Sequence, residues 1–200
     1  MRVILIGFTG TIGREVKREL GLNHEVVTAS RTSGDFRVDI ASPDSIEALF
    51  RHVGSFDAVV CTAGAARFGR LVELSHDDLM FGLGNKLMGQ VNLVRIGLRF
   101  INDNGSFTLT SGILARQPMP GSSSISMVNA GLEGFVRAAA LEMERGIRVN
   151  VVSPVWVKET LETLGWDSSI GMPAEKVARS YKASVDGKQN GVVLDVQDFV

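Results

Sequence analysis

A run of apolar residues that ends in a glycine-rich turn constrains the fold of this chain more than any other stretch. Residues 2–6 read Arg-Val-Ile-Leu-Ile, which is typical of a strand buried on both faces of a parallel sheet. Residues 7–13, GFTGTIG, come next, and Ile12, Val16 and Leu20 then recur every four residues. That period places the three side chains on one face of a helix. The stretch therefore predicts a strand, a tight turn and a helix.

The three glycines of the turn leave two interpretations open. Gly7, Gly10 and Gly13 lack a Cβ atom, so the backbone can turn sharply and approach a pyrophosphate lying on the free N–H groups of the helix. Their GxxGxxG spacing differs from the GxGxxG dinucleotide fingerprint. Turns of this kind also join a strand to a helix where no ligand binds, so the stretch alone favours neither interpretation.

Composition narrows the class of protein. Two hundred residues with 44% hydrophobic and 22% charged side chains indicate one globular domain, residues 1–200, and exclude a disordered chain. The formal net charge of −1 gives no sign of a nucleic-acid-binding surface. No apolar run approaches the ~18 residues of a membrane span. The single cysteine, Cys61, cannot form an internal disulfide, and it predicts a buried, reduced thiol in a cytoplasmic protein.

Strand and helix patterns alternate along the rest of the chain. Further strands are expected at residues 25–30, 36–40, 57–61, 105–110, 147–152 and 191–196, and helices at residues 42–53, 75–100, 124–144 and 173–184. Repeated alternation of this kind predicts a parallel sheet with right-handed crossovers. The predicted fold class is therefore α/β, a Rossmann-type, doubly wound parallel sheet with helices on both faces.

The end of the second strand bears on the choice of nucleotide. In a doubly wound sheet this end lies beside the first glycine turn, where the adenosine ribose of a dinucleotide would bind. Arg31, flanked by Ser30, Thr32 and Ser33, offers a guanidinium and hydroxyls to a ribose 2′-phosphate where an acidic residue would accept from a 2′-hydroxyl. The pattern favours NADP(H). The alternative is a solvated arginine in a polar turn.

With these positions in place, the chain resembles the short-chain dehydrogenase/reductase family over essentially its whole length. The glycine turn is similar to that family's TGxxxGxG loop, and residues 61–64 (CTAG) resemble its NNAG turn. Residues 38–40 resemble the segment whose aspartate meets the adenine, and Ser111 stands where the family has its catalytic serine. Residues 147–154 resemble the family's IRVNxxxPG signature, and Thr160 resembles the threonine that helps to clamp nicotinamide.

The resemblance implies a binding site for NADP(H) and a reaction that interconverts a small carbonyl and an alcohol. It also implies a homodimer or homotetramer formed through the helices that follow the fourth and fifth strands. No metal site is expected. The implied cofactor-binding residues are Gly7, Thr9, Gly10, Thr11, Ile12, Gly13, Ser30, Arg31, Thr32, Asp39, Ile40, Thr62, Ala63, Gly64, Pro154 and Thr160.

The chain departs from the family at the catalytic YxxxK pair. Alignment on the helix that follows places Ile125 at the tyrosine position and Asn129 at the lysine position, whereas counting from Ser111 places Ser124 at the tyrosine. The only tyrosine, Tyr181, lies in the last predicted helix and is expected to be a packing residue. The family's tyrosine supplies the proton to the alkoxide, so altered or reduced activity is expected.

Asn129 suggests a rearranged site. In ketoreductase domains of polyketide and fatty-acid synthases, members of the same family, the active-site lysine and asparagine exchange places, and Lys86 resembles the lysine of that arrangement. Asn85 is the competing residue, because asparagine is the type found there in ordinary members. The catalytic candidates are therefore Ser111, Lys86, Asn129 and Asn85. Each also has an ordinary structural interpretation as a solvated or backbone-bonding side chain.

These observations predict an NADP(H)-dependent oxidoreductase of small carbonyl compounds. The alternative is a catalytically impaired NADP(H)-binding sensor or regulatory protein, and an isomerase or dehydratase is a third, weaker hypothesis. After Pro154, apolar side chains form either a substrate lid or a hydrophobic plug over the sheet edge; they are Trp156, Leu161, Leu164 and Trp166.

Overall fold

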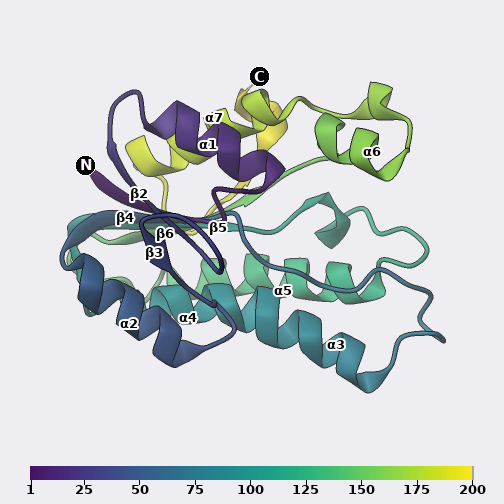
Figure 1. Cartoon of the computed structure of the whole chain (residues 1–200), viewed down its shortest axis with the longest axis horizontal. Helices are drawn as coiled ribbons and strands as arrows, with labels where there is room; N and C mark the ends of the chain where they lie inside the picture. The colour runs from purple at the N-terminus through teal and green to yellow at the C-terminus, as the bar shows by residue number, and fades with distance from the viewer. Residues whose placement is uncertain (200) are drawn as a thin grey trace.

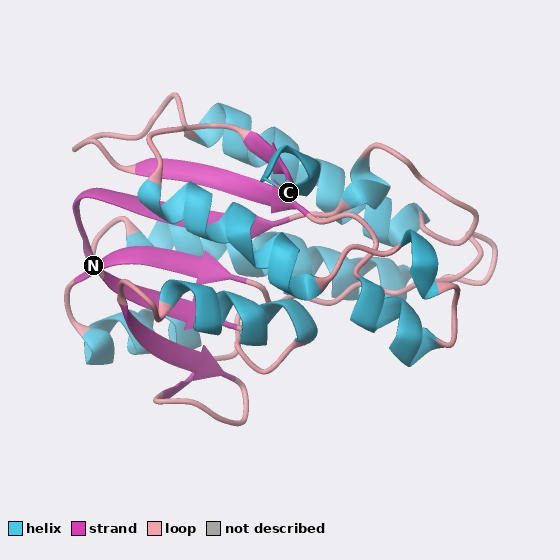
Figure 2. Ribbon diagram, turned by 90° about the horizontal axis from the view of Figure 1, so that it is seen from above, coloured by secondary structure: helices cyan, strands magenta, loops and turns pink. Residues whose placement is uncertain are grey.

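A parallel sheet forms the middle layer of the structure, a computed structural model that describes residues 1–199. Its strands are β1 (Arg2–Ile6), β2 (Glu25–Ser30), β3 (Phe36–Arg37), β4 (Phe56–Cys61), β5 (Ile101–Thr110), β6 (Arg148–Ser153) and β7 (Val193–Asp195). Their order across the sheet is β3-β2-β1-β4-β5-β6-β7, and each neighbouring pair is parallel. The arrows in Figure 2 accordingly point to one end of the molecule, where the carboxyl ends of the strands meet.

Helices cover both faces of the sheet (Figure 1). On one face lie α1 (Thr11–Leu20) and α7 (Ala174–Asp186), which pack against each other, together with α6 (Lys158–Leu164). The other face carries α2 (Pro43–Val53), α3 (His76–Gly82), α4 (Met88–Gly97) and α5 (Ser123–Ala139). Short helical turns occur at Leu83–Leu87, Ile113–Ala115, Ser168–Ile170 and Val196–Phe199.

The first strand shows why this three-layer arrangement forms. Ile4 and Ile6 belong to the apolar core beneath α2, α4 and α5, whereas Val3 and Leu5 belong to the core beneath α1 and α7. Successive side chains of a strand point to opposite faces, so an unbroken apolar run is buried on both sides. The predicted α/β fold class, a doubly wound parallel sheet with helices on both faces, is confirmed.

The point where the strand order reverses lies between β1 and β4. The chain builds outward from β1 to β2 and β3, then returns to place β4 on the other side of β1. In an open α/β sheet, ligands bind outside the carboxyl ends of the strands at such a switch point. The glycine turn after β1 and the CTAG turn after β4 meet there.

Several predicted boundaries are wrong. The expected strand at residues 36–40 is shortened to Phe36 and Arg37. The Val38 N–H still bonds the Ser30 carbonyl, but Asp39 already turns the chain toward the Ser42 cap of α2. The expected helix at residues 124–144 ends at Ala139, where a turn leads to Gly146 with φ of +70°. Helix α6 was not expected, and β5 begins earlier than residue 105.

The expected single helix at residues 75–100 is interrupted. Between α3 and α4, Leu83–Leu87 forms a π-helical turn, a feature that often occurs at functional sites. Gly82 and Gly89 are explained by close packing, since a Cβ atom would lie 3.1 Å from Ala66 and 3.0 Å from Ile40, respectively. A Cβ atom at Gly84 would meet nothing within 4 Å, so packing does not account for that glycine.

Candidate active site

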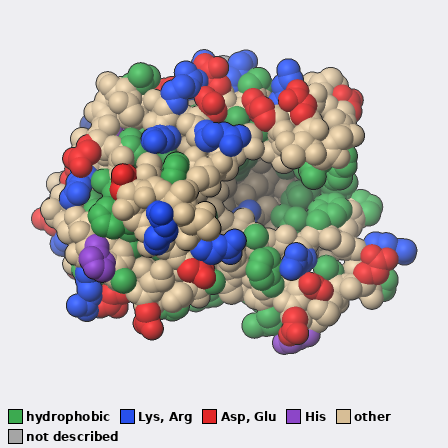
Figure 3. Space-filling view, in the orientation of Figure 1, with side chains coloured by type: hydrophobic (Ala, Val, Ile, Leu, Met, Phe, Trp, Pro, Cys, Tyr) green, Lys and Arg blue, Asp and Glu red, His purple; other side chains and the backbone are tan. Residues whose placement is uncertain are grey.

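A cleft opens at the switch point, between the two helical layers. Figure 3 shows it as a hollow in the surface, with hydrophobic side chains gathered along one side. A cavity of about 380 Å³ occupies its nucleotide half. The residues that line this cavity are Ile6, Gly7, Thr9, Ser30, Arg31, Thr32, Val38, Asp39, Ile40, Ala63, Gly64, Ala65, Phe81 and Asn85.

Two glycines of the turn, Gly7 and Gly13, are packed so tightly that a side chain would not fit. Gly7 has φ of +88°, and a Cβ atom on it would lie 2.8 Å from the backbone nitrogen of Ala63. A Cβ atom on Gly13 would lie 2.1 Å from the carbonyl oxygen of Gly7. These two glycines let the start of α1 approach the ends of β1 and β4.

The start of α1 is open to an anion. Gly10 is its N-cap, no side chain caps it, and its first turn contains no acidic residue. The first N–H groups of a helix have no partner within the helix, and with the helix dipole they favour a negatively charged group. Thr11, Ile12 and Gly13 present these N–H groups, so the turn fits the pyrophosphate of a dinucleotide.

The end of β2 provides a cation, Arg31, whose guanidinium is not paired with a nearby carboxylate of the same turn. Arg31 is exposed and makes no hydrogen bond or ion pair with any residue from 1 to 199. Thr32 lies beside it in the cavity, while the hydroxyl of Ser30 donates to the carbonyl of Ser33 at 2.8 Å. The nearest acid along the turn, Asp35, accepts from the backbone N–H and hydroxyl of Thr28. Those hydrogen bonds lower the pKa of Asp35 and occupy it away from Arg31.

The other predicted nucleotide residues divide into two groups. Asp39, Ile40, Ala63 and Gly64 line the cavity. Thr62 instead donates its hydroxyl to the carbonyl oxygens of Ile6 and Gly7, which holds the two turns together. Pro154 and Thr160 do not line this cavity; the Pro154 carbonyl accepts from the Ile113 N–H at 2.8 Å, and Thr160 lies in α6.

The π-helical turn brings both Asn85 and Lys86 to the strand ends. Asn85 Oδ1 accepts from the N–H of Ala65 at 2.8 Å, and Lys86 Nζ donates to the carbonyl of Ser111 at 3.1 Å. The Lys86 stem lies over Gly64, where a Cβ atom would come within 2.8 Å of Cγ. Burial lowers the pKa of the Lys86 ammonium to about 8. Asn85 thus fixes the turn after β4, and Lys86 is the cation at the end of β5.

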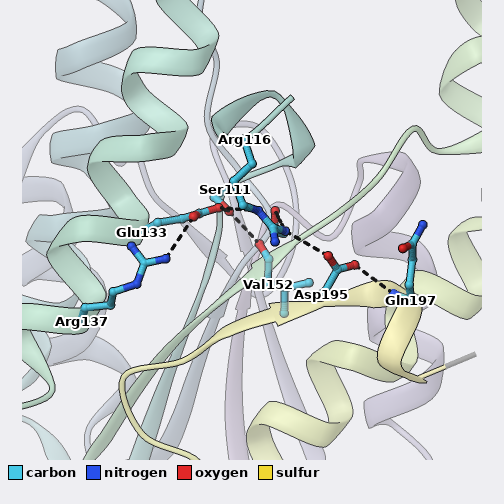
Figure 4. Close-up of polar contacts among 8 residues, drawn as sticks. Ser111, Arg116, Glu133, Arg137, Val152, Asp195 and Gln197 are labelled. Atoms are coloured by element: carbon cyan, nitrogen blue, oxygen red, sulfur yellow. Dashed lines mark hydrogen bonds and ion pairs between the residues drawn. The ribbon is translucent and has the colours of Figure 1, made fainter. Parts of the chain in front are cut away.

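The hydroxyl of Ser111 is held by an acid on α5. It donates to Glu133 Oε1 at 3.3 Å, and Ser111 is only 3% exposed. Figure 4 shows the Glu133 carboxylate pointing toward Ser111, with Arg137 on one side of it and Arg116 on the other, next to Ser111. Arg137 lies 3.4 Å from Glu133 Oε2, and Arg116 lies 3.9 Å from Oε1. The structure therefore brings the Ser111 backbone to Lys86, but it directs the side chain toward this ion-pair cluster.

Asn129 lies against the same strand end. A Cβ atom on Gly112 would be 3.0 Å from Asn129 Nδ2. Asn129 is 2% exposed and its Oδ1 has no hydrogen-bond partner in the described part of the chain. An orphaned buried acceptor of this kind has the capacity to hold a water or ligand donor. Lys86 and Asn129 thus converge on the Ser111–Gly112 backbone.

The two positions proposed for the missing tyrosine have different surroundings. Ser124 is fully buried, and a Cβ atom on Gly82 would lie 3.2 Å from its hydroxyl. Ile125 is only partly buried and precedes Asn129 by one helical turn. The geometry thus leaves more room for a ring at Ile125.

Tyr181 packs in the core, as expected. It is fully buried in α7, and its hydroxyl lies 2.7 Å from Thr110 Oγ1. Because Thr110 Oγ1 donates to the Cys61 carbonyl, the tyrosine is the donor in this pair. Burial raises the pKa of Tyr181 and also that of Cys61. The expected burial of the Cys61 thiol is confirmed as well.

Sequence reasoning missed Glu133 and Arg116. Their roles depend on contacts between residues 17 and 22 positions apart along the chain, from Arg116 to Glu133 and from Ser111 to Glu133. One signal was present in the sequence: Glu133 lies four residues after Asn129, so both face the same side of α5. Within residues 1–199 no group of three His, Cys, Asp or Glu is placed to hold a metal ion. No helix in the same range is long and apolar enough to cross a bilayer.

Comparison with known proteins decides the family. A family model described as enoyl-(acyl carrier protein) reductase, of the short-chain dehydrogenase/reductase type, matches residues 14–191. The chain belongs to the short-chain dehydrogenase/reductase family. The protein lin1944 from Listeria innocua is 42% identical, with a TM-score of 0.95 over 98% of this chain and 99% of that one. A small-chain dehydrogenase solved in complex with NADPH is 27% identical, with a TM-score of 0.85 over 98% of this chain and 95% of that one.

The chain matches about three fifths of the length of its first curated relatives. The 3-oxoacyl-[acyl-carrier-protein] reductase of Mus musculus is 30% identical over 141 residues, which cover 66% of this chain. The match spans 60% of the mouse protein, and 59% of the corresponding rat protein.

Proposed function

We propose that this short-chain dehydrogenase/reductase binds NADP(H) and interconverts a small carbonyl compound and its alcohol. The observation that carries the proposal is the guanidinium of Arg31, which pairs with no residue from 1 to 199, in the cavity lined by the glycine turn that leads into the uncapped α1. The relative solved with NADPH supports the same choice of nucleotide.

The chain's residues fit the proposed nucleotide part by part. The N–H groups of residues 11–13 would hold the pyrophosphate, and Arg31 with Thr32 would hold the 2′-phosphate. Asp39 and Ile40 line the cavity where an adenine would lie, and the turn at Ala63 and Gly64 would pass along the dinucleotide. When bound, NADPH supplies the hydride that reduces a carbonyl.

Lys86 is the residue best placed to act on the carbonyl oxygen. Its ammonium lies at the end of β5, and a cation there would stabilise the developing oxyanion and hold a proton for it. With a pKa of about 8, it gives up a proton near neutral pH more readily than an exposed lysine. Asn129, with its free Oδ1, would position a water between the lysine and the oxygen. Ser111 would orient the carbonyl only after rotating away from Glu133.

The direct test measures turnover. Purified protein should bind NADPH and oxidise it in the presence of a panel of aldehydes and ketones, followed by the loss of nicotinamide absorbance. The matched pair Lys86→Met and Lys188→Met separates a role in the reaction from a general effect of charge, because Lys188 is exposed and lies outside the cleft. The proposal fails if NADPH binds and no carbonyl on a broad panel is reduced.

The burial of Tyr181 favours a second candidate function. The chain's single tyrosine is fixed in the core, so no phenol reaches the cleft. A domain that binds NADP(H) tightly but transfers protons poorly would serve as a sensor of the cofactor's redox state. If the protein is instead an enzyme limited only by the missing phenol, Ile125→Tyr should create or raise carbonyl reduction, whereas Ser124→Tyr should mainly destabilise the fold, because Ser124 is fully buried. Absence of turnover in the wild type and in both variants would support the sensor.

We further propose a two-fold homo-oligomer that uses α4 and α5. Exposed methionines lie on this side of the molecule, Met88 at 44% and Met127 at 42%. Apolar side chains of this kind are common at interfaces between identical chains. Light scattering at tens of micromolar protein should report a dimer or tetramer, and a monomer would contradict this assembly.

A further inference from the structure

A second cavity lies at the carboxyl ends of β5, β6 and β7. Its volume is about 470 Å³, within the range of small-molecule sites. It shares no lining residue with the nucleotide cavity. The residues that line it are Ile113, Arg116, Gln117, Val155, Trp156, Ile170, Gly171, Met172, Pro173, Lys176, Asp195 and Gln197.

The cavity contains one cation more than its lining acids can neutralise. Arg116 Nη2 lies 3.1 Å from Asp195 Oδ2 and 3.3 Å from the Ser153 hydroxyl. Asp195 also accepts from the N–H of Gln197 through Oδ1, so both of its oxygens are engaged (Figure 4). Lys176, on the first turn of α7, makes no ion pair with the residues that the structure describes. The unmatched charge in this cavity is therefore the ammonium of Lys176.

Gln117 and Gln197 are the other polar members of the lining, and the apolar part of the wall is held in place. The carbonyl of Trp156 accepts from the N–H of Met172 at 2.8 Å, and the backbone N–H of Lys158 donates to the Met172 carbonyl at 2.9 Å. The Trp156 ring lies 5.7 Å from that of Trp166, which in turn lies 6.4 Å from the Phe68 ring. The backbone hydrogen bond to Met172 and the ring contact with Trp166 hold Trp156 in place. Its ring therefore offers a preformed surface to an apolar group.

We propose that this cavity binds a small monocarboxylate with an aromatic or branched apolar body. Lys176 would pair with the carboxylate, and Trp156 with Met172 would contact the body. A charge-assisted pair requires an unpaired cation, and an apolar wall of fixed shape accepts a hydrophobic group without an ordering cost. A phosphate fits less well, because Asp195 would repel its second charge and the apolar wall would gain nothing.

The site also adjoins the strand end where the proposed reaction would take place. Ile113 is two residues from Ser111, and Arg116 contacts Glu133, which accepts from the Ser111 hydroxyl. The bound acid can thus be either a substrate held beside Ser111 or a separate effector. Binding itself does not depend on turnover, so it is measured without nucleotide.

The test uses Trp156 as its reporter. The chain has two tryptophans, and Trp166→Phe leaves Trp156 as the only one. Titration of this protein with 3-phenylpropionate should give a saturable change in fluorescence. In that background Lys176→Met should weaken binding at least tenfold, while Lys188→Met should leave it unchanged. The neutral 3-phenylpropanamide should also bind at least tenfold more weakly than the acid, and raised salt should weaken the acid alone.

Three outcomes would overturn the proposal: no saturable change, equal affinity in Lys176→Met, or an amide that binds as tightly as the acid. A further experiment distinguishes whether the bound acid is a substrate or an effector. If the acid is a substrate, phenylpyruvate should be reduced with NADPH, and Lys176→Met should raise its KM. If it is an effector, 3-phenylpropionate should change turnover of a carbonyl that lacks a carboxylate. Failure of NADPH binding or of all turnover would leave the fluorescence result standing, so the two proposals fail separately.

Discussion

The two halves of the cleft present different kinds of chemical group to a ligand. In the nucleotide half, around β1 and β4, the ligand surface consists of backbone N–H groups and of glycines whose Cβ atoms would collide with neighbouring backbone. In the half around β5 and β6, the surface consists of side chains: Lys86 bonds the Ser111 carbonyl, Ser111 bonds Glu133, and Asn129 has an Oδ1 without a partner in the described part of the chain. The nucleotide half therefore depends on positions that lack a side chain, whereas the other half depends on the conformations of its side chains.

From this difference we expect the nucleotide half to tolerate few substitutions and the other half to tolerate more. Main-chain atoms form the nucleotide surface, and they cannot avoid a new side chain by changing rotamer. A substitution there either fits or displaces the main chain. A side-chain site can lose one group and use another, as expected here, where the family's tyrosine and lysine are missing but Lys86 reaches the same strand end.

The largest expected effect tests the rigidity of the glycine turn. Gly13→Ala would place a Cβ atom 2.1 Å from the Gly7 carbonyl oxygen, with backbone on all sides. We expect a loss of about 3 kcal/mol or more in the free energy of unfolding, together with loss of NADPH binding. Gly10→Ala is the matched control, because its nearest atom would be 3.5 Å away and its φ is −73°. Denaturant unfolding of both variants measures the difference, and similar losses would contradict a cradle fixed by sterics.

A second test addresses the side-chain half. Lys86→Ala should lower kcat/KM for carbonyl reduction by about 10²-fold, the contribution of a preorganised donor, while NADPH affinity changes much less. Ser111→Ala should also lower kcat/KM, and Asn85→Ala should have a smaller effect because Asn85 bonds the backbone. Steady-state kinetics and NADPH titration separate the two quantities. A parallel loss of affinity would show that Lys86 serves the nucleotide instead.

The pH profile gives an independent readout of the same lysine. Its pKa is about 8, and the protonated form is the one that stabilises an oxyanion. Reduction should therefore be fastest below about pH 8 and should fall by about tenfold per pH unit above it. The break should disappear in the residual activity of Lys86→Ala. A wild-type profile that is flat from about pH 6 to about pH 10 would contradict a role for the Lys86 proton.

The same contrast explains what the sequence could predict. The doubly wound parallel sheet, its two-sided helical cover and the glycine turn after β1 follow from apolar periods and glycine positions, which are local. The π-helical turn at Leu83–Leu87 and the Ser111–Glu133 pair depend on packing between elements far apart in the chain. The length of the shortest strand was also predicted wrongly: β3 is two residues long because the chain leaves β2 after the bond from the Val38 N–H to the Ser30 carbonyl. Local pattern carries no information about such pairing.

A smaller effect is expected at the ribose end. Arg31 is exposed and unpaired among residues 1–199, so NADPH should bind more tightly than NADH by at least tenfold, or about 1.4 kcal/mol. Arg31→Asp should reverse the order by repelling the 2′-phosphate and accepting from a 2′-hydroxyl. Titration of each protein with both nucleotides measures this, with Arg37→Asp as a control. Equal affinities in the wild type would mean that the nucleotide half recognises only the pyrophosphate.

The smallest expected effect is at a glycine of α5. It tests whether glycines in this half of the cleft are required by close packing, as Gly7 and Gly13 of the glycine turn are. Gly134 lies inside α5, is exposed, and a Cβ atom there would meet nothing within 4 Å. Alanine favours a helix over glycine by about 0.5–1 kcal/mol, so Gly134→Ala should raise the melting temperature by roughly 1–4 °C. Gly131→Ala is the matched variant, because its Cβ atom would lie 3.1 Å from Leu87 and should cancel the gain. If Gly134→Ala instead destabilises the protein, and does so only at concentrations where it is oligomeric, then α5 packs closely against a second copy. In that case Gly134 is constrained by contact between chains, as Gly13 is constrained within one.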